Sequence, residues 1–122
     1  METDNILIAK FMGEKLPYIN NQGRFEYMVE GAGLISSTNA KDLYRFLRYN
    51  YNTDWNRLMQ VVEKIECCDF IFSIHHEVAN IFNGECNELT YNETTQARTK
   101  IEAVYNACVE FIKWYNENKS HL

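Results

Sequence analysis

Hydrophobic residues recur at helical spacing in the last quarter of the chain. At 100° per residue, the apolar side chains of residues 101–115 fall on one arc and the charged ones fall opposite. Thr99 and Glu102 have the spacing of a capping box, in which each side chain satisfies an amide of the first helical turn. The pattern therefore predicts a surface helix with one buried face over about 100–117.

Three residues of this predicted helix lie outside its apolar arc. Ala103, Ala107 and Trp114 fall on the flank of the polar side. We therefore expect the core not to use the tryptophan. Trp114 becomes a candidate exposed aromatic residue for a binding surface.

A second amphipathic pattern covers about 54–66 and predicts another long helix. Thr53 or Asp54 can cap its first turn, because a side-chain oxygen there accepts a hydrogen bond from a free backbone amide. Polar residues fill the outer side. One arc collects the residues expected to be buried, which are Trp55, Leu58, Met59, Val62 and Ile65.

Two shorter helices are predicted in the first half of the chain. Residues 4–12 share an apolar face, with Asp4 as the expected cap and Gly13 as the expected stop. Asn39 is a plausible cap for a helix over about 40–49.

Strand patterns separate the helices. Alternation over 24–30 predicts a half-buried strand that Gly31 and Gly33 end, and the β-branched and aromatic run 69–76 predicts another. Residues 77–83 fit either a strand or one short helix. An edge strand is also expected around Leu89 and Tyr91. The predicted fold is therefore α+β, a small mainly antiparallel sheet with the two long helices packed on one face.

Composition limits the architecture to one domain. The 122 residues, with 46% hydrophobic content, suffice for a single globular domain over 1–122. No window is apolar enough to cross a bilayer, and the N-terminus lacks the pattern of a signal peptide, so a soluble cytoplasmic protein is expected. The four cysteines form no CxxC pair, which favours reduced thiols.

Charge is unevenly distributed along the chain. The net charge of −5 disfavours indiscriminate binding to duplex nucleic acid. Residues 41–57 nevertheless form a local basic patch, which could hold phosphates while tyrosines stack on bases, or could meet an acidic protein partner or a second copy. The simpler interpretation is a charged outer helix face, with the tyrosines of the turn packed over the core. The candidate residues are Lys41, Arg45, Arg48, Tyr49, Tyr51 and Arg57.

Candidate chemical sites are weaker. Cys68, His75 and His76 carry zinc-binding donor atoms and could converge if a hairpin folds between them, but their spacing matches no known zinc pattern. Adjacent pairs on a strand would also point to opposite faces. We therefore expect no metal, no cofactor and no catalytic residue. A metal-dependent or thiol enzyme using these residues remains the least favoured alternative.

Three segments carry a resemblance to known sequences. FMG at 11–13, WNRLMQVVEKIE at 55–66 and KIEAVYNACVEFIKWYN at 100–116 resemble a set of short uncharacterised proteins of bacterial, phage and prophage genomes. Proline is common in that set at the position of Gln60, and valine at the position of Cys108. The resemblance implies an accessory protein of a mobile element and implies no chemistry.

Taken with the charge pattern, the resemblance makes a small non-enzymatic binding protein the leading functional prediction. It would act through a surface that takes a protein partner or a second copy. A nucleic-acid-binding factor that uses the basic patch is the alternative.

Overall fold

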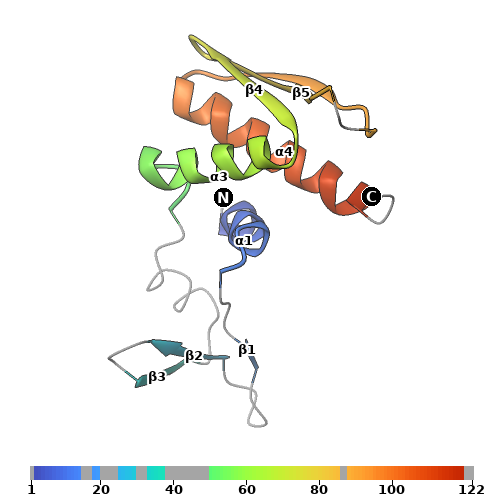
Figure 1. Ribbon diagram of the computed structural model, residues 1–122. Coiled ribbons are helices and arrows are strands. Elements are labelled where there is room, and N and C mark those ends of the chain that lie inside the picture. The colour runs from blue at the N-terminus through green and yellow to red at the C-terminus, as the bar shows by residue number, and fades with distance from the viewer. Residues whose placement is uncertain are drawn as a thin grey trace. The chain divides into compact units, whose positions relative to one another are not determined.

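The computed structural model divides the chain into two compact units, Met1–Tyr49 and Asn50–Leu122 (Figure 1). Each unit is described by itself, and the single domain expected over 1–122 stays a prediction. The residues that the structure describes are 2–14, 18–19, 25–29, 33–37, 50–85 and 88–119. The predicted helix over 40–49 lies outside them.

Helix α1, Glu2–Phe11, opens the first unit. It begins two residues before the predicted cap, so Asp4 lies in the first turn, where a carboxylate still interacts favourably with the helix dipole. The predicted stop is confirmed. Gly13 adopts φ +75°, and the amides of Gly13 and Glu14 donate to the carbonyls of Lys10 and Ala9 at 3.1 and 3.0 Å. This is a Schellman motif, whose left-handed position favours glycine.

An antiparallel sheet follows α1, with the strand order β1-β2-β3. Its strands are β1 (Tyr18–Ile19), β2 (Phe25–Val29) and β3 (Gly33–Ser37). Strand β2 confirms the strand predicted over 24–30. Gly33, however, does not end that strand but begins the next one, where it pairs with Val29. Strand β3 escaped prediction because its two apolar residues are adjacent and do not alternate with polar ones.

Helix α3, Trp55–Cys67, begins the part of the second unit that carries the core. Asp54 is its cap, since its Oδ1 accepts from the amides of Asn56 and Arg57 at 2.9 and 3.3 Å. The buried face is rotated from the predicted arc. Trp55 and Met59 are 39% and 37% exposed, and Val61 takes their place. The buried residues keep the i, i+3, i+4, i+7 spacing of a helix face and are Leu58, Val61, Val62 and Ile65.

The second sheet has the order β4-β5-β6, with both neighbouring pairs antiparallel. Strand β4 (Phe70–His75) confirms the strand predicted over 69–76, and β5 (Val78–Asn83) decides the open choice at 77–83 in favour of a strand. Strand β6 is Asn92–Gln96. The edge strand was therefore expected too early, because the polar run of β6 offers no alternation to recognise.

Opposed residues of the sheet define its two faces. Phe72 pairs with Ile81, which pairs with Glu93, so these three side chains share the face that packs on the helices. Buried residues Phe70, Ala79 and Ile81 lie on this face. Ile71, 45% exposed, lies on the opposite face.

Helix α4, Lys100–Asn118, covers the inner face of this sheet, and its cap Thr99 accepts from the Glu102 amide at 3.2 Å. It contacts all three strands and also α3, which itself contacts β4 (Figure 1). Ala103 and Ala107, expected on the polar flank, are instead buried at 0% and 3% exposure. Because α4 packs on both the sheet and α3, a wider arc of its surface is buried. The small alanine side chains let these neighbours approach closely. The arrangement confirms the predicted α+β class.

Gly84 directly follows β5, and its backbone is hydrogen-bonded to Asp69, which directly precedes β4. Its amide donates to the Asp69 carbonyl at 2.8 Å. A Cβ at this position would lie 2.7 Å from the same carbonyl oxygen and would also overlap the Asp69 carboxylate. Asn-Gly pairs are typical of turns, and here the glycine of the pair Asn83-Gly84 marks a close backbone approach that only glycine allows.

No helix in the described parts of the chain combines the length and the apolar character needed to cross a membrane.

Candidate functional site

Most of the basic patch lies beyond what the structure describes. Lys41, Arg45, Arg48 and Tyr49 all lie outside the described residues. Tyr51 is described and is 1% exposed, so its ring packs in the core and offers no face for a base to stack on. Arg57 is partly exposed on α3. Of the six candidates, the structure therefore describes one buried tyrosine and one arginine, which are too few to define a site.

The cysteine and histidine candidates do not converge. Cys68 precedes β4 and His75 ends it, so an extended strand, and not a hairpin, separates them. The five steps from Phe70 to His75, at about 3.3 Å each, place the two ends of this strand roughly 17 Å apart. Among the described residues, no group of three or more histidine, cysteine or acidic side chains could hold a metal ion.

His75 and His76 depart from expectation in another way. Their rings lie 4.2 Å apart between centroids, although adjacent strand residues were expected to point apart. His76 has left the strand and adopts φ +53° in the two-residue turn between β4 and β5. The turn brings the two rings together in solvent, where both residues are exposed.

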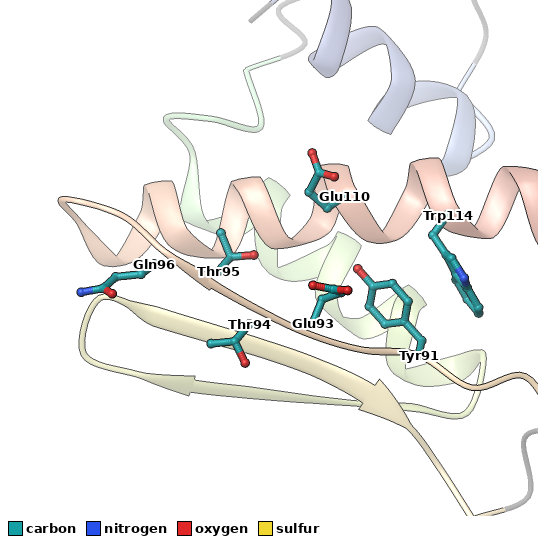
Figure 2. Close-up of a pocket in the computed structure, with 7 residues that line it drawn as sticks. All are labelled: Tyr91, Glu93, Thr94, Thr95, Gln96, Glu110 and Trp114. Carbon is teal, nitrogen blue, oxygen red and sulfur yellow. The ribbon is translucent and has the colours of Figure 1, made fainter.

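A solvent-open groove lies between β6 and α4 in the described part of the second unit (Figure 2). We call it the β6–α4 groove. Its volume is about 480 Å³. The residues that line it are Tyr91, Glu93, Thr94, Thr95, Gln96, Glu110 and Trp114.

Aromatic rings form one wall of this groove. Trp114 is only partly exposed, and its ring lies 4.7 Å from that of Tyr91 and 5.9 Å from that of Phe111, measured between centroids. Phe70 of the sheet meets Phe111 edge-on at 4.8 Å. The core therefore does use the tryptophan, against expectation, because the side of α4 that carries Trp114 packs against Phe70 at the start of β4. Such packing fixes the position of both groove aromatics.

Two carboxylates lie beside the aromatic wall. Glu93 comes from β6 and Glu110 from α4, and both residues are exposed. Lys113 Nζ lies 3.8 Å from Glu110 Oε1, but both side chains are more than half exposed, so this ion pair is weak. Burial first, and then the nearby Glu93 and Glu110 carboxylates, raise the pKa of Tyr91 to about 12. The phenol therefore lies in a negative electrostatic potential.

The outer edge of β6 runs along the groove. The Asn83 amide donates to the Tyr91 carbonyl at 2.9 Å, and the Ala97 amide donates to the Glu77 carbonyl at 3.1 Å. Antiparallel ladders alternate, so the backbone groups of the residues between them, Asn92, Thr94 and Gln96, point away from β5. In the described part of the chain, no strand pairs with this edge.

Side-chain hydrogen bonds hold β6 in place from the opposite face of the sheet. The side-chain nitrogen of Asn80 shares its two protons among three acceptors, which are Asn92 Oδ1 and Thr94 Oγ1, both at 3.0 Å, and the Glu93 carbonyl oxygen at 2.9 Å. These bonds tie the edge strand to its neighbour over three consecutive residues. The free edge is therefore fixed before any ligand arrives.

Sequence reasoning identified Trp114 but missed the rest of this groove. Glu93, Thr95 and Gln96 belong to a polar run without periodicity, and Glu110 appeared as one of several outward charges on its helix. Only the pairing of β6 with β5 and the packing of α4 beneath it bring them together. Comparisons of the chain with protein-family models, with curated proteins and with solved structures gave no match.

Proposed function

We propose that this protein is a small non-enzymatic binding protein that takes a protein partner along the outer edge of β6. One observation carries the proposal. A strand edge with outward backbone groups lies directly beside a groove that has an aromatic wall. An extended segment can add to such an edge through main-chain hydrogen bonds, while its alternate side chains enter the adjoining groove.

The character of the edge supports this function. Natural proteins protect free edges with proline, lysine, bulges or covering segments. Strand β6 contains neither proline nor lysine, and it pairs with β5 in an unbroken five-residue register. Its one charged residue, Glu93, faces α4, and this inward charge disfavours a neutral or acidic strand but leaves the edge open to a basic one.

The resemblance to short phage and prophage proteins supports placing this activity in an accessory protein of a mobile element, working in the cytoplasm. Nucleic-acid binding through Lys41, Arg45 and Arg48 is the alternative. The β6–α4 groove does not favour it, because Glu93 and Glu110 would repel phosphates. Replacing those three basic residues with glutamine should leave protein binding through β6 unchanged.

A pair of substitutions at Thr94 tests the proposal. Thr94→Pro removes an amide that points away from β5, so the ladder of the protein itself is preserved. Thr94→Val also loses the hydroxyl bonded by Asn80 but keeps the amide, which makes it the matched control. A partner captured from the native host should then be purified, and its affinity should be measured for the parent and both variants by calorimetry.

We expect Thr94→Val to bind as the parent does and Thr94→Pro to lose most of its affinity. Circular dichroism melts should show both variants folded. Equal binding by Thr94→Pro and Thr94→Val would show that the partner does not use this edge.

A further inference from the structure

The Tyr91 hydroxyl is the most informative atom of the groove. Tyr91 is 6% exposed, yet its hydroxyl points into the groove towards Glu93 and Glu110 (Figure 2). None of the described residues hydrogen-bonds this hydroxyl. A phenol enclosed to this degree normally has a partner, so the oxygen is available to a donor that enters the groove.

The groups around this hydroxyl suit a planar cation. Glu93 has no ion-pair partner among the described residues, and the partner of Glu110 is an exposed lysine, Lys113. Trp114 presents an aromatic surface on the same wall. A guanidinium stacks on aromatic faces, donates to several acceptors at once and carries the opposite charge to the two carboxylates. An ammonium would gain the charge attraction but not the planar stacking.

We infer that the β6–α4 groove selects an arginine side chain from an extended partner segment that pairs with the outer edge of β6. The inference rests on the proposed function. A strand added at about 4.8 Å from β6 has every second side chain on the side of α4. One of these side chains then enters the groove, where Glu93 and Glu110 accept its hydrogen bonds and Trp114 supports its plane.

Charge distinguishes this occupant from a second copy of the chain. Pairing β6 with β6 of another copy would place two Glu93 carboxylates on the same face of the joined sheet. A single inward charge on an edge strand disfavours pairing with a neutral or acidic strand. A strand that brings arginine neutralises this charge, so Glu93 both blocks self-pairing and selects the ligand.

Selection from a library of random dodecapeptides tests the inference without a known partner. The folded parent protein is the bait, and peptides retained equally by Thr94→Pro are removed. We expect arginine to be enriched at one fixed position within an alternating pattern. In the best peptide, citrulline at that position should weaken binding about tenfold, because it keeps the shape and loses the charge.

Variants of the groove complete the test. Glu93→Gln with Glu110→Gln should weaken the arginine peptide about tenfold and leave the citrulline peptide unchanged. Glu117→Gln, an exposed position of the same helix outside the groove, should change neither.

Two negative results have different meanings. Peptides that require the Thr94 amide but show no preference for arginine would overturn the inference and leave the proposed function standing. Failure to obtain any peptide that distinguishes Thr94→Val from Thr94→Pro would overturn both.

Discussion

Gly84→Ala should destabilise the second unit strongly, because the new methyl group meets a backbone carbonyl oxygen as well as the movable Asp69 carboxylate. The Cβ would lie 2.7 Å from the Asp69 carbonyl oxygen, well inside van der Waals contact. The Gly84 amide donates to that same oxygen at 2.8 Å, so the clash cannot be relieved without lengthening this hydrogen bond. The link between the end of β5 and the start of β4 would therefore loosen.

The expected cost is the sum of two contributions. Overpacking against a fixed neighbour costs about 1–3 kcal/mol, and weakening a backbone hydrogen bond costs about 1 kcal/mol more. The free energy of unfolding should therefore fall by about 2–4 kcal/mol. For a chain of this size the melting temperature should fall by about 4 °C for each kcal/mol, or about 8–16 °C in total.

Thermal melts followed by circular dichroism measure this effect, with two controls. Gly13→Ala meets nothing within 4 Å but retains φ +75°, so it should cost only about 1–2 kcal/mol for backbone strain. Asp69→Gly removes the carboxylate and suits φ +66°. Combined with Gly84→Ala, it should recover only part of the loss, because the carbonyl contact remains.

The outcome that refutes this reasoning is a Gly84→Ala variant that melts within about 2 °C of the parent, half the shift expected for 1 kcal/mol. Full recovery in the double variant would show that the Asp69 carboxylate alone causes the clash.

Three further predictions concern the core, the groove and the thiols. Val62→Asp or Ile112→Asp should abolish cooperative melting, because each buries an unpaired carboxylate at a cost of several kcal/mol. Cys108→Val, at a fully buried position, should be nearly neutral. A parent-like melt of either aspartate variant would contradict the burial of these helix faces. Between pH 10 and 12 the folded state holds the Tyr91 proton that the unfolded state releases. The free energy of unfolding in urea should therefore fall for the parent relative to Tyr91→Phe as pH rises, by about 1 kcal/mol at pH 11 after allowance for solvent screening. If this free energy depends on pH in the same way in both proteins, the raised pKa is refuted. A chelator should leave the melting temperature unchanged, because Cys68 and His75 lie at opposite ends of β4. A lower melting temperature with chelator, together with stoichiometric zinc by elemental analysis, would refute this.

The sequence was most informative where one local rule decides the structure. Capping boxes and side-chain caps placed the starts of α3 and α4 within a residue, since Asp54 and Thr99 satisfy amides only a few positions away. Burial around these helices was predicted less well. Met59 fits the apolar arc of α3 yet is 37% exposed, and Ala107 falls outside that of α4 yet is buried, because neighbouring elements decide which arc is covered.

The strands show the same division between features set by the local sequence and features set by neighbouring elements. Strand β4 is rich in β-branched and aromatic residues, so local preference revealed it. Strand β6 has the sequence NETTQ, in which no apolar residue marks an inward side, and only its pairing with β5 makes it a strand. The β6–α4 groove depends on that pairing. Of the groove residues, only Trp114 was proposed from the sequence. The reason was that it falls outside the apolar arc of its helix, and its packing in the core overturned that reason.

A polar edge strand is a weak signal in sequence for the same reason that it can serve as a binding surface. Inward apolar residues would anchor β6 on the core, but Glu93 and Thr95 leave space above α4 that a partner can fill. The side-chain amide of Asn80 replaces that anchor from the other face through its hydrogen bonds to β6, so the strand stays ordered without closing the groove. Order without apolar burial is what an edge requires if its backbone and its groove are both to remain open to a ligand.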